Sequence, residues 1–293
     1  MTVPQSRRIV GRKFSRFACV DWSGAKGNRH KGIALAVCEK GASAPELIVP
    51  NKGLWSRQGI ADWLLAQQDD LLMGFDFSFA PPFIERGSYL PGDDVPDTAR
   101  AFWAYVDAQC EDDDLGAASL LEHRHRRHFY FGAVDGRKAD FMHSRRCEAH
   151  YNAQGGGKPS TIYDAIGAAQ VAKASFAGMR LLHHVGKKLP VWPFDQLAKS
   201  GPQIVEIYTQ IAARASGVPK GRSKIRDRDA LDAALSSIGS LPHNPLDQYT
   251  DHVTDAILTA AWLRKIAENP TFWTPPELNL KIAATEGWTF GVI

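Results

Sequence analysis

Acidic side chains end three short apolar segments of this 293-residue chain. Each acid stands between two apolar residues, as in Val20-Asp21-Trp22, Phe75-Asp76-Phe77 and Val205-Glu206-Ile207. Carboxylates that meet in a partly dry site repel one another, and a hard divalent cation with oxygen ligands is the usual counter-charge. Two such ions about 3.5 to 4 Å apart can activate water and stabilise the leaving oxygen in phosphodiester hydrolysis. A single acid at a strand end can also be a turn cap, but the series of three favours a site for Mg²⁺ or Mn²⁺.

A further pair of acids lies in a C-terminal segment with helical spacing. Asp251 and Asp255 are four residues apart and therefore share one face of the helix. Asp251 follows Thr250, a suitable N-cap, and the helix dipole favours an acid in that first turn. Asp255 lies farther in, among apolar residues, where the dipole explains it less well. We expect both to bind metal, and Asp255 to join Asp21, Asp76 and Glu206 as a catalytic residue.

The elements that must position these acids follow from hydrophobic periodicity and turn signals. Strands are predicted at Phe17–Trp22 and Gly32–Cys38, which form a hairpin, and at Glu46–Val49, Leu71–Phe75 and Ile204–Ile207. Helices are predicted near 60–67, 96–110, 165–185, 227–238 and 251–268. This order predicts an α/β fold with a mixed sheet, antiparallel in the hairpin and parallel beyond it. In such sheets, ligands gather at the C-terminal ends of the parallel strands.

The domain organisation predicted is one domain over residues 1–293. Its core comprises residues 17–82 and 160–293. Residues 83–159 are the least regular part and form a basic insertion, within which 96–110 is the predicted helix. We expect this insertion to carry function.

Several motifs, in their order along the chain, resemble the ribonuclease-H-like superfamily. They are VDWSG at 20–24, GFDFSFAPP at 74–82, VEIY at 205–208, DHVTDAILTAAWL at 251–263 and EGWTFGV at 286–292. Within the superfamily the chain is most similar to the domain-of-unknown-function 429 family of predicted nucleases, and the step from His252 to Asp255 is similar to that of RuvC-type resolvases. The resemblance covers residues 17–78 and 160–293. It implies a divalent-metal nuclease with Asp21, Asp76, Glu206 and Asp255 at its acidic positions.

Two basic segments could bind the phosphates of a nucleic acid. Lys220, Arg222 and Lys224 follow the Glu206 strand, where they could reach the carboxylate edge or simply form ion pairs with Asp227 and Asp229 at a helix start.

The second basic segment is the His123–Phe131 run. There Arg124, Arg126 and Arg127 precede aromatic residues, a combination that single-strand-binding surfaces use. The alternative is a basic loop folded against the acidic run Glu111–Asp114.

A histidine-rich stretch in the insertion raises the question of zinc. His143, Cys147 and His150, with His123, His125 or His128 as a fourth ligand, could make a tetrahedral site. No C-x-x-C pair anchors such a site. The sequence therefore leaves zinc binding open.

Composition limits the class of protein. With 44% hydrophobic and 23% charged residues the chain is typical of a globular protein, and no apolar run approaches the ~20 residues of a membrane span. We expect a cytoplasmic protein that does not enter a membrane and whose four widely spaced cysteines are reduced.

Two other functions compete with a nuclease. An ATP-binding phosphotransferase of the actin and sugar-kinase type could use the turn after Asp21, with Lys26, to hold phosphate, but the chain has one such hairpin and too little length for two copies of the fold. A non-catalytic nucleic-acid-binding module is the third hypothesis, and the intact acids argue against it. The choice of DNA, RNA or branched substrate, endo- or exo-cleavage, oligomeric state and pathway stay open.

Overall fold

The computed structural model describes residues 12–167, 170–219 and 224–293. A sheet lies at its centre, with strands in the order β3-β2-β1-β4-β5. The strands are β1 (Arg16–Asp21), β2 (Ala34–Glu39), β3 (Glu46–Ile48), β4 (Leu71–Asp76) and β5 (Gln203–Glu206). β2 pairs antiparallel with β1 and β3, while β4 pairs parallel with β1 and β5. The structure thus confirms an α/β fold with a mixed sheet.

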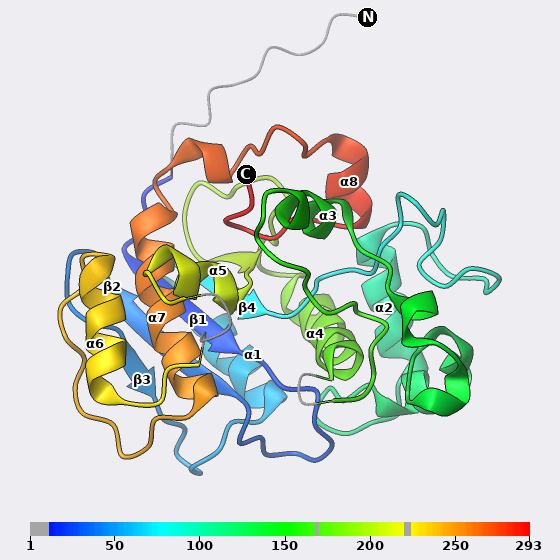
Figure 1. The fold of residues 1–293 in the computed structure, drawn as a ribbon, viewed down its shortest axis with the longest axis horizontal. Helices are drawn as coiled ribbons and strands as arrows, with labels where there is room; N and C mark the ends of the chain where they lie inside the picture. The colour runs from blue at the N-terminus through cyan, green and yellow to red at the C-terminus, as the bar shows by residue number, and fades with distance from the viewer. Residues whose placement is uncertain (1–11, 168–169, 220–223) are drawn as a thin grey trace, which may run out of the picture.

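Helices cover both faces of the sheet, and Figure 1 shows α7 lying over β1 and β2. One face packs against α1 (Arg57–Leu65), α2 (Ala99–Gln109) and α4 (Val171–Val185). The other packs against α5 (Thr209–Ala215), α6 (Arg228–Ser237) and α7 (Asp251–Ile266). Two further helices are α3 (Arg146–Ala153) and α8 (Leu280–Thr285), and short 3₁₀ or π turns occur at Leu120–Arg124, Arg126–His128, Ala133–Asp135, Lys138–Phe141 and Pro270–Phe272. No helix within the described ranges combines the length and apolar character that crossing a bilayer demands.

The two faces of the sheet are set by alternation along β1. Phe17 and Cys19 enter the core on the α7 side, while Ala18 and Val20 enter the core on the α4 side. Successive side chains of a strand point to opposite faces, so a strand buried on both sides is apolar throughout. Asp21 follows Cys19 by two residues, so its side chain points to the same face of the sheet, the one that α7 covers.

Side-chain caps fix where three of the helices begin. Ser56 accepts a hydrogen bond from the Gly59 N–H at the start of α1, and Asp227 accepts one from the Ala230 N–H at the start of α6. Thr250 caps α7. Such caps satisfy backbone donors that have no partner inside the helix. The Thr250 cap sets the start of α7, and with it the helical positions of Asp251 and Asp255.

The insertion packs onto the core and contains more regular structure than the sequence predicts. The predicted helix at 96–110 is confirmed as α2, which packs against α4. α3, which the sequence does not predict, also lies in the insertion. Its apolar positions are too few for a clear periodicity, and it is held by contacts outside itself.

The buried carboxylate of Glu286 joins two parts of the insertion, its start and the start of α3. Its Oε1 accepts hydrogen bonds from the N–H groups of Phe83 and Ile84 at 2.7 and 2.8 Å. Its Oε2 accepts one from the Arg146 N–H at 2.7 Å. The start of the insertion and the start of α3 are therefore held together by one side chain.

We predict that Glu286→Gln lowers the free energy of unfolding by about 2 to 3 kcal/mol. The amide keeps the size but turns an N–H group toward a backbone donor, so a buried N–H loses its acceptor. Urea unfolding measures the effect, and Glu277→Gln, at an exposed position, is the matched control, expected within about 0.5 kcal/mol of the parent. Equal stabilities of the two variants would contradict this role for Glu286.

Candidate metal centre

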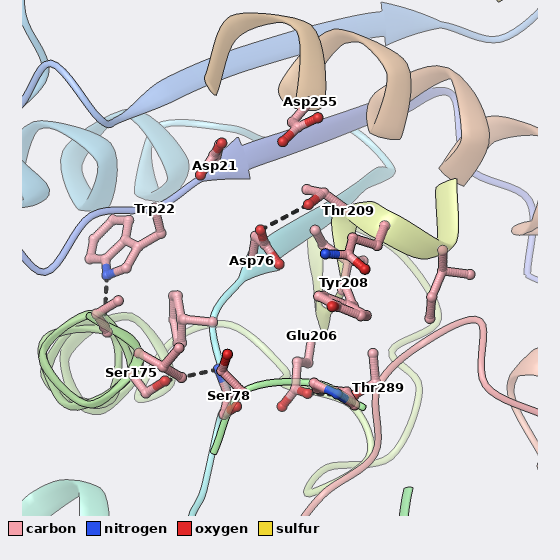
Figure 2. Close-up of a pocket in the computed structure, with 18 of the residues that line it drawn as sticks. Asp21, Trp22, Asp76, Ser78, Ser175, Glu206, Tyr208, Thr209, Asp255 and Thr289 are labelled. Carbon is pink, nitrogen blue, oxygen red and sulfur yellow. Dashed lines mark hydrogen bonds between the residues drawn. The ribbon is translucent and has the colours of Figure 1, made fainter. Parts of the chain in front are cut away.

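Asp21 and Asp76 lie side by side at the C-terminal ends of two neighbouring parallel strands. They are direct register partners in the pairing of β1 with β4. Neighbouring strands are about 4.8 Å apart and register partners point to the same face of the sheet. Figure 2 shows both side chains entering one space. The structure thus places these two acids next to each other.

Asp255 reaches the same place from the covering helix. It lies in the second turn of α7, which packs on β1 and β2. In Figure 2 its carboxylate faces Asp21 across the end of the strands. The group Asp21, Asp76 and Asp255 is called the acid triad below.

The acid triad is electrostatically strained when no cation is present. Burial, and then the charge of Asp21, raise the pKa of Asp255 from 3.8 to about 7. Burial, together with the charges of Asp21 and Asp255, raises the pKa of Asp76 well above its usual value, and burial also raises that of Asp21. Desolvation and like charge disfavour the ionised forms, which a cation would stabilise.

The donor set of the triad is made of oxygen, which suits Mg²⁺ or Mn²⁺. The nearby Cys19 thiol is fully buried, and burial followed by the charge of Asp76 raises its pKa well above the usual range, so it stays protonated. In the part of the chain that the structure describes, the triad is not among the groups whose three ligand atoms lie within 4.8 Å of one another.

Two polar side chains support the triad. The Thr209 hydroxyl donates a hydrogen bond to Asp76 Oδ2 at 3.1 Å, drawn in Figure 2. His252 Nδ1 lies 3.1 Å from Asp21 Oδ2, and this hydrogen bond raises the pKa of the imidazole. The His252 side chain is 45% exposed, so it lies between the acids and solvent. Sequence reasoning noted His252 only within a motif. Its spacing of three residues from Asp255, on one helix face, is the signal that could have placed it in the site.

Glu206 is the predicted ligand that the structure does not bring to the triad. It pairs with Phe75 rather than with Asp76, so its side chain enters the opposite face of the sheet. Figure 2 shows it turned away from the triad, toward Thr289. The cause is a shift of one residue: because side chains alternate along a strand, the position beside Asp76 belongs to Ile207. Apolar residues flank Glu206 on both sides, so the sequence pattern does not reveal which face it takes.

The Glu206 carboxylate is fully engaged where it lies. Arg145 Nη1 and Nη2 donate to its Oε2 and Oε1 at 2.7 and 2.5 Å. The Thr289 hydroxyl donates to Oε1 at 2.6 Å and the Phe79 N–H to Oε2 at 2.7 Å. Such a paired and hydrogen-bonded buried charge has a structural role. We therefore do not keep Glu206 as a metal ligand.

Asp251, the other predicted ligand in α7, has basic partners instead. Lys224 Nζ lies 2.5 Å from Asp251 Oδ2, and Arg226 Nε lies 3.1 Å from Oδ1. Asp251 and Lys224 both line the cavity in front of the triad. Lys224 therefore reaches the predicted edge, whereas Lys220 and Arg222 lie outside the described residues.

The predicted phosphate contacts from the other basic groups are separate from this cavity. Lys26 pairs with Glu122, Arg126 with Asp135 and Arg127 with Asp93. Arg124 is exposed, and no ion pair forms to it from the described residues. None of these basic residues lines the cavity.

The alternative interpretation of the basic run, folded against Glu111–Asp114, also differs from the structure. Asp114 instead accepts hydrogen bonds from His30 and the backbone of Arg57.

The residues proposed for zinc from the sequence are spread apart. Cys147 Sγ contacts the Thr289 hydroxyl, the His143 ring lies edge-on to Tyr163, and His150 hydrogen bonds to Gln154. Over the residues that the structure describes, no metal-type cluster contains any of the three.

A cavity of about 650 Å³ opens in front of the triad. The triad, His252 and Thr209 form one wall. Another wall comes from the insertion and its flank, including Tyr151 of α3, Pro159 and Ser160. The insertion therefore shapes this cavity.

The chain has no match among protein-family models, curated proteins or solved structures. The resemblance to ribonuclease-H-like nucleases thus remains a prediction from the motifs and the geometry.

We predict that the contribution of Asp255 to the stability of the metal-free protein falls as pH rises from about 4 to about 8. Asp255 has a pKa near 3.9 when unfolded and about 7 when folded. The folded state thus binds this proton more tightly, and its advantage disappears as pH rises through that window. Thermal unfolding of the parent and of Asp255→Asn gives the measurement, with Asp62→Asn, an exposed acid of α1, as control.

The difference in melting temperature between Asp255→Asn and the parent isolates the effect of Asp255 from that of the other titrating residues. The melting temperature of Asp255→Asn should rise relative to that of the parent as pH rises. Mn²⁺ should reduce this difference by stabilising the parent. A difference that does not change with pH would contradict a strained Asp255.

Proposed function

We propose that this protein is a ribonuclease-H-like, divalent-metal-dependent nuclease, related to the domain-of-unknown-function 429 family, that hydrolyses phosphodiester bonds with Mg²⁺ or Mn²⁺. One observation carries the proposal: Asp21, Asp76 and Asp255 come from two strand ends and a covering helix to one buried place that opens into a cavity. Among the described residues no Lys or Arg forms an ion pair with Asp21, Asp76 or Asp255, and the partially exposed His252 beside Asp21 is their one basic neighbour, so these carboxylates strongly favour a cation. Glu206, by contrast, has Arg145.

The bound ions would lower the pKa of a coordinated water and neutralise charge on the leaving oxygen. The chain supplies the rest. Asp21 and Asp76 are rigid because they end strands, and Thr209 fixes the orientation of Asp76. His252 lies beside Asp21 with its side chain 45% exposed, and it could donate a proton to a leaving oxygen at the mouth of the cavity.

The cavity favours an unpaired strand over a duplex. A volume of about 650 Å³ is in the range of small-ligand pockets and has room for about one or two nucleotides. Tyr151 and Tyr208 line it and could stack on bases, while Lys224 could bind a phosphate. We expect cleavage of single strands or strand ends to exceed cleavage of duplexes.

We predict that Asp21→Asn reduces metal-dependent cleavage by about a thousandfold or more, because loss of a ligand removes several kcal/mol of charge stabilisation. The test is a cleavage screen over single-stranded, duplex, hybrid and branched substrates with Mg²⁺ or Mn²⁺. Asp62→Asn, the same isosteric change on the far side of the sheet, should retain the parent rate.

The variant should fold, because the change relieves repulsion in the metal-free state, and unfolding curves check this. Parent-like cleavage by Asp21→Asn on every substrate would contradict the proposal. An inactive parent that instead binds ATP with Mg²⁺ at micromolar affinity would favour the phosphotransferase.

We predict that Lys224→Gln weakens single-strand binding and lowers the salt slope of log affinity by about 0.7, the value for one lost phosphate contact. Arg124→Gln, a matched change in the basic run outside the cavity, should leave the slope unchanged. Fluorescence anisotropy at several salt concentrations measures both. A larger loss of affinity in Arg124→Gln than in Lys224→Gln would place the nucleic-acid-binding surface on the basic run.

A further inference from the structure

A second cluster of potential ligands lies in the insertion, away from the acid triad. Asp93 follows the turn at Pro91-Gly92, and His125 and His128 lie in the helical turns near 124–128. One ligand atom from each residue lies within 4.8 Å of the others. We propose that Asp93, His125 and His128 form a site for a divalent transition ion of the Zn²⁺ type.

The donor set separates this site from the acid triad. Two imidazole nitrogens and one carboxylate oxygen are a common three-ligand set for zinc, with water in the fourth position. Imidazole favours ions such as Zn²⁺, whereas Mg²⁺ prefers oxygen ligands. The two sites would therefore select different metals.

Outer contacts orient two of the three ligands. The Tyr105 hydroxyl lies 2.8 Å from His125 Nε2, leaving Nδ1 directed at the cluster. Arg127 hydrogen bonds to Asp93 Oδ1, leaving Oδ2 directed at the cluster. Metal-binding histidines and carboxylates characteristically have such partners on their other atoms, which fix the tautomer and the orientation of the ring.

The geometry accommodates an ion after a small expansion. His125 Nδ1 and His128 Nε2 lie 2.7 and 2.8 Å from the same atom, Asp93 Oδ2. Tetrahedral ligands at about 2.0 to 2.1 Å from zinc lie about 3.3 Å apart, so an opening of about half an ångström suffices. In that arrangement His125 Nδ1 and His128 Nε2 present lone pairs to the ion, and bonds to the ion replace their hydrogen bonds to Asp93 and the 3.3 Å hydrogen bond that Arg127 Nε donates to His128 Nε2.

The burial of the three side chains fits a site that keeps one open position. The histidine side chains are 6% and 7% exposed, and the Asp93 side chain is 21% exposed. Solvent thus reaches the carboxylate edge but not the rings. A bound ion would join the loop at residue 93 to the turns at 124–128.

Calorimetry with Zn²⁺ in the presence of excess Mg²⁺ tests the site in the full-length protein. The parent should bind one equivalent, and His128→Gln should bind at least about tenfold more weakly. His123→Gln, an exposed histidine in the same run, should bind as the parent does. Unchanged zinc affinity in His128→Gln, or no binding by the parent, would overturn the proposal.

X-ray absorption of the zinc-loaded parent gives an answer that does not depend on how a variant folds. Nitrogen and oxygen neighbours at 2.0 to 2.2 Å, without sulfur, are expected. Sulfur at about 2.3 Å would overturn the proposal and assign the ion to a site that includes a cysteine. Neither readout uses cleavage, so the result stands apart from the nuclease assignment.

Discussion

The parallel pairing of β1 with β4 is the constraint on which the site depends. Its register places Asp21 opposite Asp76, and the spacing of strands then sets their separation. The hydrophobic pattern holds that register firmly, because a slip of one residue would move Cys19 and Leu72 from the α7 core to the other face. The fold therefore keeps two repelling carboxylates together through apolar packing that neither acid contributes to.

The same alternation gives Glu206 a different task. On the α4 side of the sheet its carboxylate pairs with Arg145, which lies immediately before α3. Removing one partner of a buried ion pair leaves the other charge uncompensated, so the pair fixes the position of α3. Glu286 holds the neighbouring backbone. Glu206 thus helps to build the wall of the cavity that comes from the insertion, while Asp21 and Asp76 belong to the other wall. Both walls depend on the same sheet.

The sequence predicts the secondary-structure elements better than it predicts how they pack against one another. The strands, α1, α2, α4, α6 and α7 follow from periodicity, because each buries an apolar face, although α4 begins at Val171 rather than at the predicted residue 165. The face of the sheet to which Glu206 points cannot be predicted from periodicity, because the register between strands that are distant in sequence depends on tertiary packing. The cluster of Asp93, His125 and His128 likewise cannot be predicted from a local sequence pattern, because Asp93 lies 32 residues from His125 along the chain. The triad could be predicted in large part because its acids interrupt otherwise apolar segments.

The central claim is that the acid triad binds divalent metal, and crystals grown with Mn²⁺ test it most directly. Anomalous scattering from manganese locates the ion without reference to activity. The account predicts manganese density in which each of Asp21, Asp76 and Asp255 has a carboxylate oxygen within about 2.0 to 2.6 Å of an ion. Density that shows the three carboxyl groups hydrogen bonded to one another, with no manganese peak between them at saturating Mn²⁺, would contradict it.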